Sequence, residues 1–208
     1  MQTMQKIQLT EAQVTKLEAG GVVEIPASWD EFMEFLSETA YRTEYHNGHI
    51  LVMGLAAFIH ELLVGNLIAL LKAVSKGKGF YVAGSNVGVL KADQSGYYNP
   101  DVTVVQGAPA FAANSNAIIT NPFLVVEVFS ESTAAYDYLH KLPKYVQIDS
   151  IQAVVFVDRF DTSVIVAERG DQPNVWTHTH YFKLTEVAKA GIFELPLTEI
   201  FADLPEEK

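Results

Sequence analysis

Apolar and polar positions recur with two different periods along this chain, and the periods divide it into helices and strands. Residues 28–38 start with a Ser-x-x-Glu capping box and continue with apolar residues at helical spacing, which predicts an amphipathic helix. Residues 60–76 carry a broad apolar face at intervals of three and four, which predicts a second, central helix. Between them, Asn47-Gly48 predicts the tight turn of a hairpin over residues 43–52, because both residues tolerate positive φ.

Beyond the second helix, the apolar residues fall into short runs typical of β-strands. The runs are 79–83, 87–91, 101–105, 123–129, 153–158, 163–167 and 175–182. Residues 133–148 are helical in composition, and Pro143 either interrupts that helix or starts a new one. This order predicts an α/β domain with a mixed β-sheet flanked by helices.

The first 27 residues are less regular than the rest of the chain. Gly20-Gly21 and Pro26 break them, and their few apolar residues predict a loosely packed N-terminal arm. The length of 208 residues fits one domain, so we expect residues 28–208 to form a single unit.

Composition narrows the range of functions. The 14 Lys and Arg residues against 25 Asp and Glu residues give a net charge of −11, which excludes general electrostatic binding to nucleic acid or anionic lipid. The absence of cysteine excludes disulfides, zinc–thiolate sites and cysteine nucleophiles. With no run of about 18 apolar residues and a polar start, we expect neither a transmembrane helix nor a signal peptide, no membrane partner, and a cytoplasmic location.

Two acidic residues lie within apolar strand runs, where a carboxylate is costly to bury unless it is paired, hydrogen-bonded or bound to a metal. Asp101 opens one run after Pro100, and Glu127 lies in the middle of another. On neighbouring strands they would form a site for a hard divalent cation such as Mg²⁺. The alternatives are a turn residue for Asp101 and an ion pair with a buried Arg or Lys for Glu127.

Three further residues are candidates for the same site, each with a plainer interpretation. Lys141 follows Asp137 at helical spacing, so it forms either a surface ion pair or a cation beside the two strand acids. Glu44 is otherwise an exposed acid at a helix end, and His60 otherwise a capping or core histidine.

The order of these residues along the chain resembles the Uma2 family of putative restriction endonucleases, part of the PD-(D/E)xK nuclease-like superfamily and abundant in cyanobacteria. The resemblance covers about residues 28–170. It is carried by Glu44-Tyr45, Gly48-His49-Ile50, His60, Asn99-Pro100-Asp101-Val102, Val125-Val126-Glu127-Val128, Ser132-Thr133, Asp137, Lys141 and Tyr145.

The resemblance implies a restriction-endonuclease-like fold and Mg²⁺-dependent cleavage of DNA, with Mn²⁺ as a possible substitute. It implies metal binding by Asp101 and Glu127, with Glu44 as a first-helix acid that adds a ligand or a supporting contact. Lys141 would position the attacking water, and His60 would be auxiliary.

The sequence departs from the family pattern at three places. Phe129 occupies the position, two residues after the second acid, where most of the superfamily has its lysine; Lys141 on the next helix replaces it. The family's Ser-Pro pairs are absent, since Ala56-Ala57-Phe58-Ile59 precedes His60 and Glu131 separates Ser130 from Ser132. Glu131, the added acid near the proposed metal, and the missing lysine favour a catalytically inactive member of the family.

Three functions therefore stay open. The first is a Mg²⁺-dependent DNA endonuclease, which fails if the two strand acids lie far apart or are neutralised by a permanent internal arginine. The second is an inactive nuclease-like module that binds a partner protein or nucleic acid. The third is zinc or iron chemistry at His178 and His180, which share one face of a strand but are better explained as surface residues.

Weak intrinsic DNA affinity is expected, because the basic residues available are few. They are Lys72, Lys76, Lys78 and Lys91, with Lys141 and Lys144 nearer the site. A homodimer would join two such patches.

Overall fold

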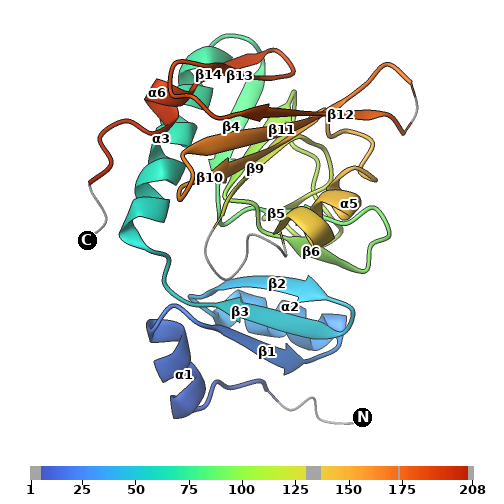
Figure 1. Cartoon of the computed structure of the whole chain (residues 1–208). Helices are drawn as coiled ribbons and strands as arrows, with labels where there is room; N and C mark the ends of the chain where they lie inside the picture. Colours follow the sequence, from blue (N-terminus) through green and yellow to red (C-terminus); the bar gives the residue numbers. More distant parts are fainter. Residues whose placement is uncertain (1–5, 130–136, 173, 206–208) are drawn as a thin grey trace.

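Two six-stranded sheets and the helices packed on them make up the protein. The computed structural model describes residues 6–129, 137–172 and 174–205. In Figure 1 the hairpin strands of the first sheet lie below the strands of the second sheet.

The first sheet is mixed, with the strand order β1-β3-β2-β6-β5-β8. Its strands are β1 (Val22–Pro26), β2 (Arg42–His46), β3 (His49–Met53), β5 (Gly88–Leu90), β6 (Gly96–Tyr98) and β8 (Ile118–Ile119). The predicted Asn47-Gly48 turn joins β2 to β3, and both residues have positive φ. All neighbours are antiparallel except β5 and β8.

The second sheet is also mixed, with the strand order β12-β11-β10-β9-β7-β4. Its strands are β4 (Phe80–Gly84), β7 (Val102–Gln106), β9 (Pro122–Val128), β10 (Ala153–Asp158), β11 (Ser163–Arg169) and β12 (Trp176–Tyr181). Only β9 and β10 run parallel to each other. The remaining hairpin pairs β13 (Val187–Ala190) with β14 (Phe193–Pro196).

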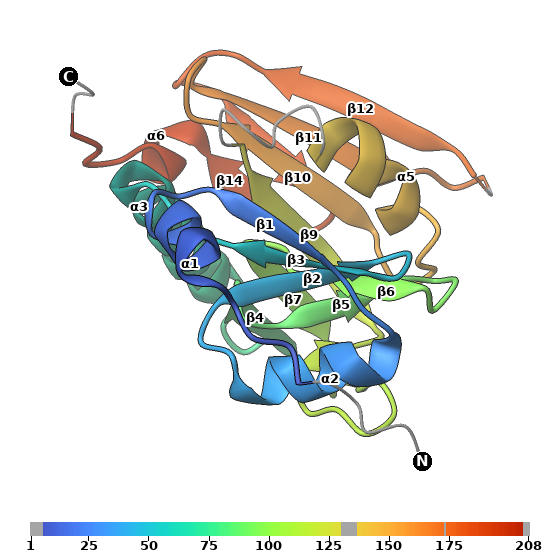
Figure 2. The ribbon, with the colours of Figure 1, turned by 90° about the horizontal axis from the view of Figure 1, so that it is seen from below.

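Helices cover both faces of the second sheet, as Figure 2 shows for α3 and α5. The helical elements are α1 (Glu11–Glu18), α2 (Trp29–Glu38), α3 (Phe58–Ser75), η1 (Asp137–Lys141), α5 (Leu142–Tyr145) and α6 (Leu197–Ile200). Buried leucines of α3 pack with Val126 on one face, whereas Leu142 and Tyr145 pack with Val125 on the other. Neighbouring residues of β9 thus serve opposite cores, because successive side chains of a strand point to opposite faces.

The predicted α/β class with mixed sheets and flanking helices is confirmed, and so is the capping box of α2, where Ser28 accepts a hydrogen bond from the backbone of Glu31. Two expectations are wrong in detail. The described strands form two six-stranded sheets and the small β13–β14 sheet instead of a single sheet. Residues 6–27, the described part of the predicted N-terminal arm, are not loosely packed, since β1 pairs with β3 along its length and Leu17 of α1 is completely buried.

The helix predicted over residues 133–148 is described only from Asp137 onward. There it is a π-helical turn, η1, followed by α5, which has Pro143 in its first turn. Pro143 is thus the second residue of α5, which follows η1 directly, so it neither ends the helical segment nor occupies the first position of a new helix. Ser130, Glu131 and Ser132, together with Thr133, lie outside the described residues.

Helix α3 bears on the expectation that the chain has no transmembrane helix. Its length and composition alone would allow it to cross a membrane, although we expected no such helix. In this fold Leu63, Leu67 and Leu71 of α3 are completely buried in the core, which is the packing of a central helix within a folded domain.

Candidate functional site

The two strand acids face each other across neighbouring strands. In the antiparallel pair of β7 and β9, Val102 lies opposite Val126, so the adjoining residues Asp101 and Glu127 are also opposed. The backbone N–H of Val128 donates to Asp101 Oδ2 at 2.8 Å, which holds that carboxylate against β9. Both acids are almost completely buried. The predicted proximity is therefore what the register of two strands produces.

A buried lysine lies beside the second acid. The Nζ atom of Lys141 is 3.2 Å from Glu127 Oε1, 3.1 Å from Glu44 Oε1 and 3.0 Å from Asp137 Oδ1. The hydroxyl of Tyr145 donates to Glu127 Oε1 at 2.6 Å. The helical spacing of Asp137, Lys141 and Tyr145 thus places all three around Glu127. The surface ion pair considered for Lys141 is excluded, because its side chain is only 6% exposed.

Strand β2 supplies a third group of polar residues from the other sheet. Arg42, Glu44 and His46 alternate along it, and alternate residues of a strand share a face. Glu44 is buried in the middle of this strand, so it is neither the first-helix acid of the resemblance nor an exposed helix-end acid. Its Oε1 accepts the backbone N–H of Asn99 at 3.1 Å, in addition to its contact with Lys141.

A chain of contacts leads from Glu44 toward the edge of the site. Glu44 Oε2 lies 3.0 Å from His46 Nε2, and His46 Nδ1 lies 3.0 Å from the Nζ atom of Lys91. Lys91 is buried and lies 4.7 Å from the centre of the Tyr98 ring. These contacts favour the alternative in which Glu44 supports the site through Lys141 and does not bind the metal directly.

Two basic side chains approach Asp101. The Nη1 atom of Arg42 donates to Asp101 Oδ1 at 2.7 Å, and its Nη2 atom donates to the carbonyl of Asn99. The Nε2 atom of His60, in the first turn of α3, lies 3.4 Å from the same Oδ1. His60 is thus joined to the proposed metal pair, as its auxiliary role requires. The arginine on Asp101 is the feature that we expected to count against metal binding.

Charge is distributed unequally over the buried acids. Burial raises the pKa of Asp101, but Arg42, His60 and the backbone N–H of Val128 together outweigh it, and the pKa lies below its ordinary value. Burial likewise raises the pKa of Glu44, but Lys141 and His46 lower it to about 2. Glu127 differs: burial, together with the charges of Asp137, Asp101 and Glu44, outweighs Lys141 and raises the pKa to about 8. Of the opposed pair, Glu127 therefore takes up a proton at higher pH than Asp101.

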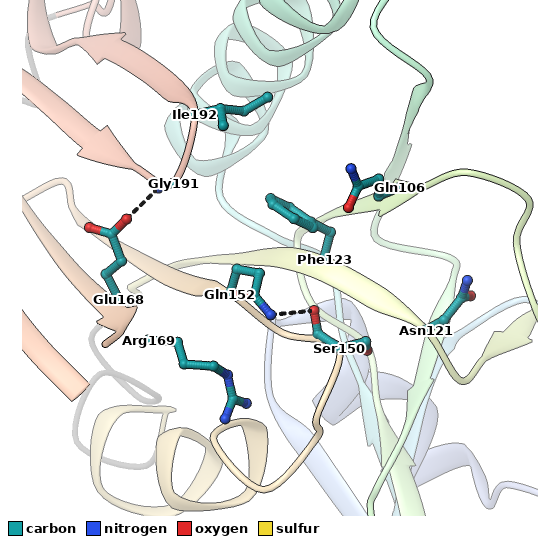
Figure 3. Close-up of a pocket in the computed structure, with 9 residues that line it drawn as sticks. All are labelled: Gln106, Asn121, Phe123, Ser150, Gln152, Glu168, Arg169, Gly191 and Ile192. Atoms are coloured by element: carbon teal, nitrogen blue, oxygen red, sulfur yellow. Dashed lines mark hydrogen bonds between the residues drawn. The ribbon is translucent and has the colours of Figure 1, made fainter. Parts of the chain in front are cut away.

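Part of this polar cluster lines an open cavity of about 590 Å³. Its wall includes Arg42, His60, Asp101, Glu127 and Lys141, together with the loop before α3. A second cavity of about 600 Å³ lies at the opposite end of β7 and β9 (Figure 3). There Glu168 accepts the backbone N–H of Gly191, and Arg169 donates to three backbone carbonyls. Those charged side chains form hydrogen bonds that hold the backbone of the fold. The cavity lined by Asp101 and Glu127 is therefore the candidate functional site.

The structure also places the two histidines considered for zinc or iron and the residue at the superfamily's usual lysine position. His178 and His180 lie on β12 with exposed side chains, and the Nδ1 atom of His178 is 3.0 Å from the Tyr138 hydroxyl. This supports their interpretation as surface residues. Phe129 packs its ring against Phe156 at 5.4 Å between centroids, so the superfamily's usual lysine position is part of the core here.

Sequence reasoning missed Arg42, His46 and the contact of Lys91 with the site. For Arg42 and His46, the sequence contained a signal that could have identified them. Arg42 and His46 flank Glu44 at two-residue spacing on a predicted strand, which places all three on one face. Nothing in the local sequence indicated that this face of β2 lies against Asp101 and Glu127, because the two sheets meet only in the folded chain.

The fold and the candidate site are those of an α/β domain with two opposed strand carboxylates and a lysine beside them. Residues 29–197 match the family Uma2, described as "Putative restriction endonuclease". The chain belongs to the Uma2 family.

The chain is also similar to two uncharacterized proteins and to one protein of known structure. The chain is 29% identical over 130 residues to the uncharacterized protein sll1609 of Synechocystis sp. (strain ATCC 27184 / PCC 6803 / Kazusa), covering 62% of this chain and 73% of that one. It is 26% identical over 152 residues to the uncharacterized protein slr1290 of the same organism, covering 73% and 78%. A crystal structure of a putative nuclease of DUF820 from Anabaena variabilis ATCC 29413 has the same fold, with a TM-score of 0.64, 18% identity, and coverage of 85% of this chain and 98% of that chain.

Proposed function

We propose that this protein is a Mg²⁺-dependent DNA endonuclease whose metal ligands are Asp101 and Glu127. The observation that carries the proposal is the opposition of these two buried carboxylates across β7 and β9, with Lys141 Nζ 3.2 Å from Glu127. Membership of a restriction-endonuclease family supports DNA as the substrate. Mn²⁺ would replace Mg²⁺, because both prefer oxygen ligands.

The residues present fit a divalent cation. Carboxylate oxygens are the ligands that Mg²⁺ prefers, and it commonly takes one or two of them and completes its shell with water. The described residues contain no group of three His, Asp or Glu side chains placed to hold a metal ion, so a cation on Asp101 and Glu127 would need waters to complete its shell. Burial, with the charges of Asp137, Asp101 and Glu44, raises the pKa of Glu127 to about 8, and a bound cation would favour its ionised form.

The chain's own residues then have distinct roles. When bound, a divalent cation supplies a more acidic water and stabilises charge on a phosphodiester. Glu127 must lose its proton to serve as a ligand. Lys141 and Tyr145 hold the orientation of Glu127 through its Oε1 atom, and Glu44 holds Lys141. Lys141 also lines the cavity, where its charge would orient a water or a phosphate oxygen.

The basic residues available for DNA are fewer than the sequence indicated. Lys91 and Lys141 are buried in contacts within the site, and Lys144 pairs with Asp93 at 3.1 Å. Lys72, Lys76 and Lys78 are exposed at the end of α3 and just beyond it. With a net charge of −11, the chain is therefore expected to bind DNA weakly by itself. A homodimer would double the exposed basic surface.

Replacing Asp101 by Asn tests this function. The purified protein is expected to nick or cut supercoiled DNA in Mg²⁺ or Mn²⁺, and Asp101→Asn to lose at least about 100-fold of that rate, because one ligand of the cation loses its charge. Gel analysis of plasmid conversion gives the rate, with Asp93→Asn as a control outside the cavity. Equal inactivity of the wild type and Asp101→Asn on every DNA substrate would reject the proposal.

One observation favours a second function, that of a nuclease-like module without cleavage activity. Arg42 already neutralises Asp101 by direct contact, and Phe129 replaces the usual lysine. Calorimetric titration with Mg²⁺ and Mn²⁺ separates the two functions. Stoichiometric binding that is lost in Asp101→Asn supports the enzyme, and absence of binding supports the module.

A further inference from the structure

Arg42 uses only part of its guanidinium group in its contact with Asp101. Nη1 donates to Oδ1, whereas Oδ2 accepts the backbone N–H of Val128. The Nε atom of Arg42 is buried without a hydrogen-bond partner. The pair is therefore not the two-pronged contact that makes arginine–carboxylate pairs strong and specific.

The two cations of the site differ in how firmly they are held. Lys141 contacts three carboxylates and its side chain is 6% exposed. Arg42 contacts one carboxylate and one carbonyl, and its side chain is 22% exposed in the wall of the cavity. Arg42 is thus the cation that can leave its position while Lys141 stays.

The position of Arg42 also conflicts with a metal ion. A cation between Asp101 and Glu127 needs an oxygen of Asp101, and Oδ1 is the one that Arg42 occupies. Two positive charges within a few ångströms in a partly buried site repel each other. A guanidinium released from Asp101 would lie in the wall of the cavity, and arginine binds phosphate oxygens in a two-pronged geometry that a carboxylate held by one oxygen does not offer.

We propose that Arg42 is an exchangeable cation of this site: it neutralises Asp101 in the metal-free protein, gives way to the divalent cation, and then contacts a phosphate of the DNA. This inference rests on the proposed function and adds a substrate-binding residue to it. It also means that the arginine on Asp101 is not a permanent substitute for a metal.

Replacing Arg42 by Gln is expected to change two affinities in opposite directions. Calorimetry with Mn²⁺ should show binding about tenfold tighter than in the wild type, because a charged hydrogen bond no longer competes for Asp101. Fluorescence anisotropy with a labelled duplex, in the presence of Ca²⁺ as a cation that also takes oxygen ligands, should show DNA affinity about tenfold weaker. Lys144→Gln removes one nearby positive charge outside the cavity and should leave Mn²⁺ affinity unchanged.

The outcomes separate this inference from the proposed function. Mn²⁺ binding that is equal or weaker in Arg42→Gln overturns the exchange, and unchanged DNA affinity overturns the phosphate contact. If neither protein binds Mn²⁺, the proposed function fails together with this inference. Thermal unfolding checks that Arg42→Gln is folded. If it is not, Arg42→Lys, which keeps the charge but not the planar fork, should shift both affinities in the same directions by smaller factors.

Discussion

Replacing Lys141 by Met is expected to destabilise the protein by about 3–5 kcal/mol at pH 8, the cost of removing one partner from a buried ion pair. Lys141 Nζ lies within 3.2 Å of oxygens of Glu44, Glu127 and Asp137. Burial lowers the pKa of Lys141, but these carboxylates outweigh it and raise the pKa well above its ordinary value. Methionine is similar in length, so the variant removes the charge and leaves the packing nearly intact. Urea unfolding followed by circular dichroism measures the loss.

A matched control is available three residues further along the chain. Lys144 pairs with Asp93 at 3.1 Å, but both side chains are more than 40% exposed. Lys144→Met should change the free energy of unfolding by less than about 1 kcal/mol, since exposed ion pairs contribute little. Equal stability of Lys141→Met and the wild type at pH 8 would contradict the role of Lys141 as the common counter-charge. Mild acid should recover part of the loss, because protonated carboxyls need no counter-charge.

The metal-free protein is expected to lose stability as the pH rises from about 5 to 8, and Glu127→Gln should remove that loss. Burial and the neighbouring acids raise the pKa of Glu127 from 4.5 to about 8. Between these values the folded protein binds a proton that the unfolded chain has released. The free energy of unfolding therefore falls with rising pH, by up to about 1.4 kcal/mol per pH unit.

Glutamine resembles the protonated carboxyl in shape and cannot ionise. Glu127→Gln and the wild type should have similar stability near pH 5, and the variant should be increasingly the more stable one up to pH 8. Urea unfolding in the presence of a chelator measures both proteins. Asp101 and Glu44 act in the opposite sense, because their lowered pKa values give stability that is lost only in strong acid. A difference between variant and wild type that does not change with pH would contradict the raised pKa of Glu127.

Much of the fold could be predicted because its signals are local. The capping box of α2, the Asn-Gly turn between β2 and β3, and the apolar face of α3 each depend on residues close together in the sequence. The prediction of a loose N-terminal arm was wrong because it also relied on local signals alone. Strand β1 is stabilised by pairing with β3, a long-range contact that its own sequence does not report.

The sequence predicted several residues of the candidate site, but it did not predict which of them contact each other. Acids inside apolar strands are conspicuous, because burying a carboxylate requires a specific reason. That argument, with the family resemblance, identified Asp101 and Glu127. It did not identify Arg42, which is an ordinary strand residue until β2 is placed beside the end of β7.

By itself, the sequence determined which residues are costly to bury and which periods the chain follows, and hence the helices, most strands and the acids that need a partner. Only the tertiary structure decided which partner each acid has. The register of β7 and β9 sets Asp101 opposite Glu127, the meeting of the two sheets puts Arg42 on Asp101, and η1 carries Lys141 to Glu127. The physical reason is that electrostatic interactions depend on distance and burial in the folded chain, and neither follows from separation along the sequence.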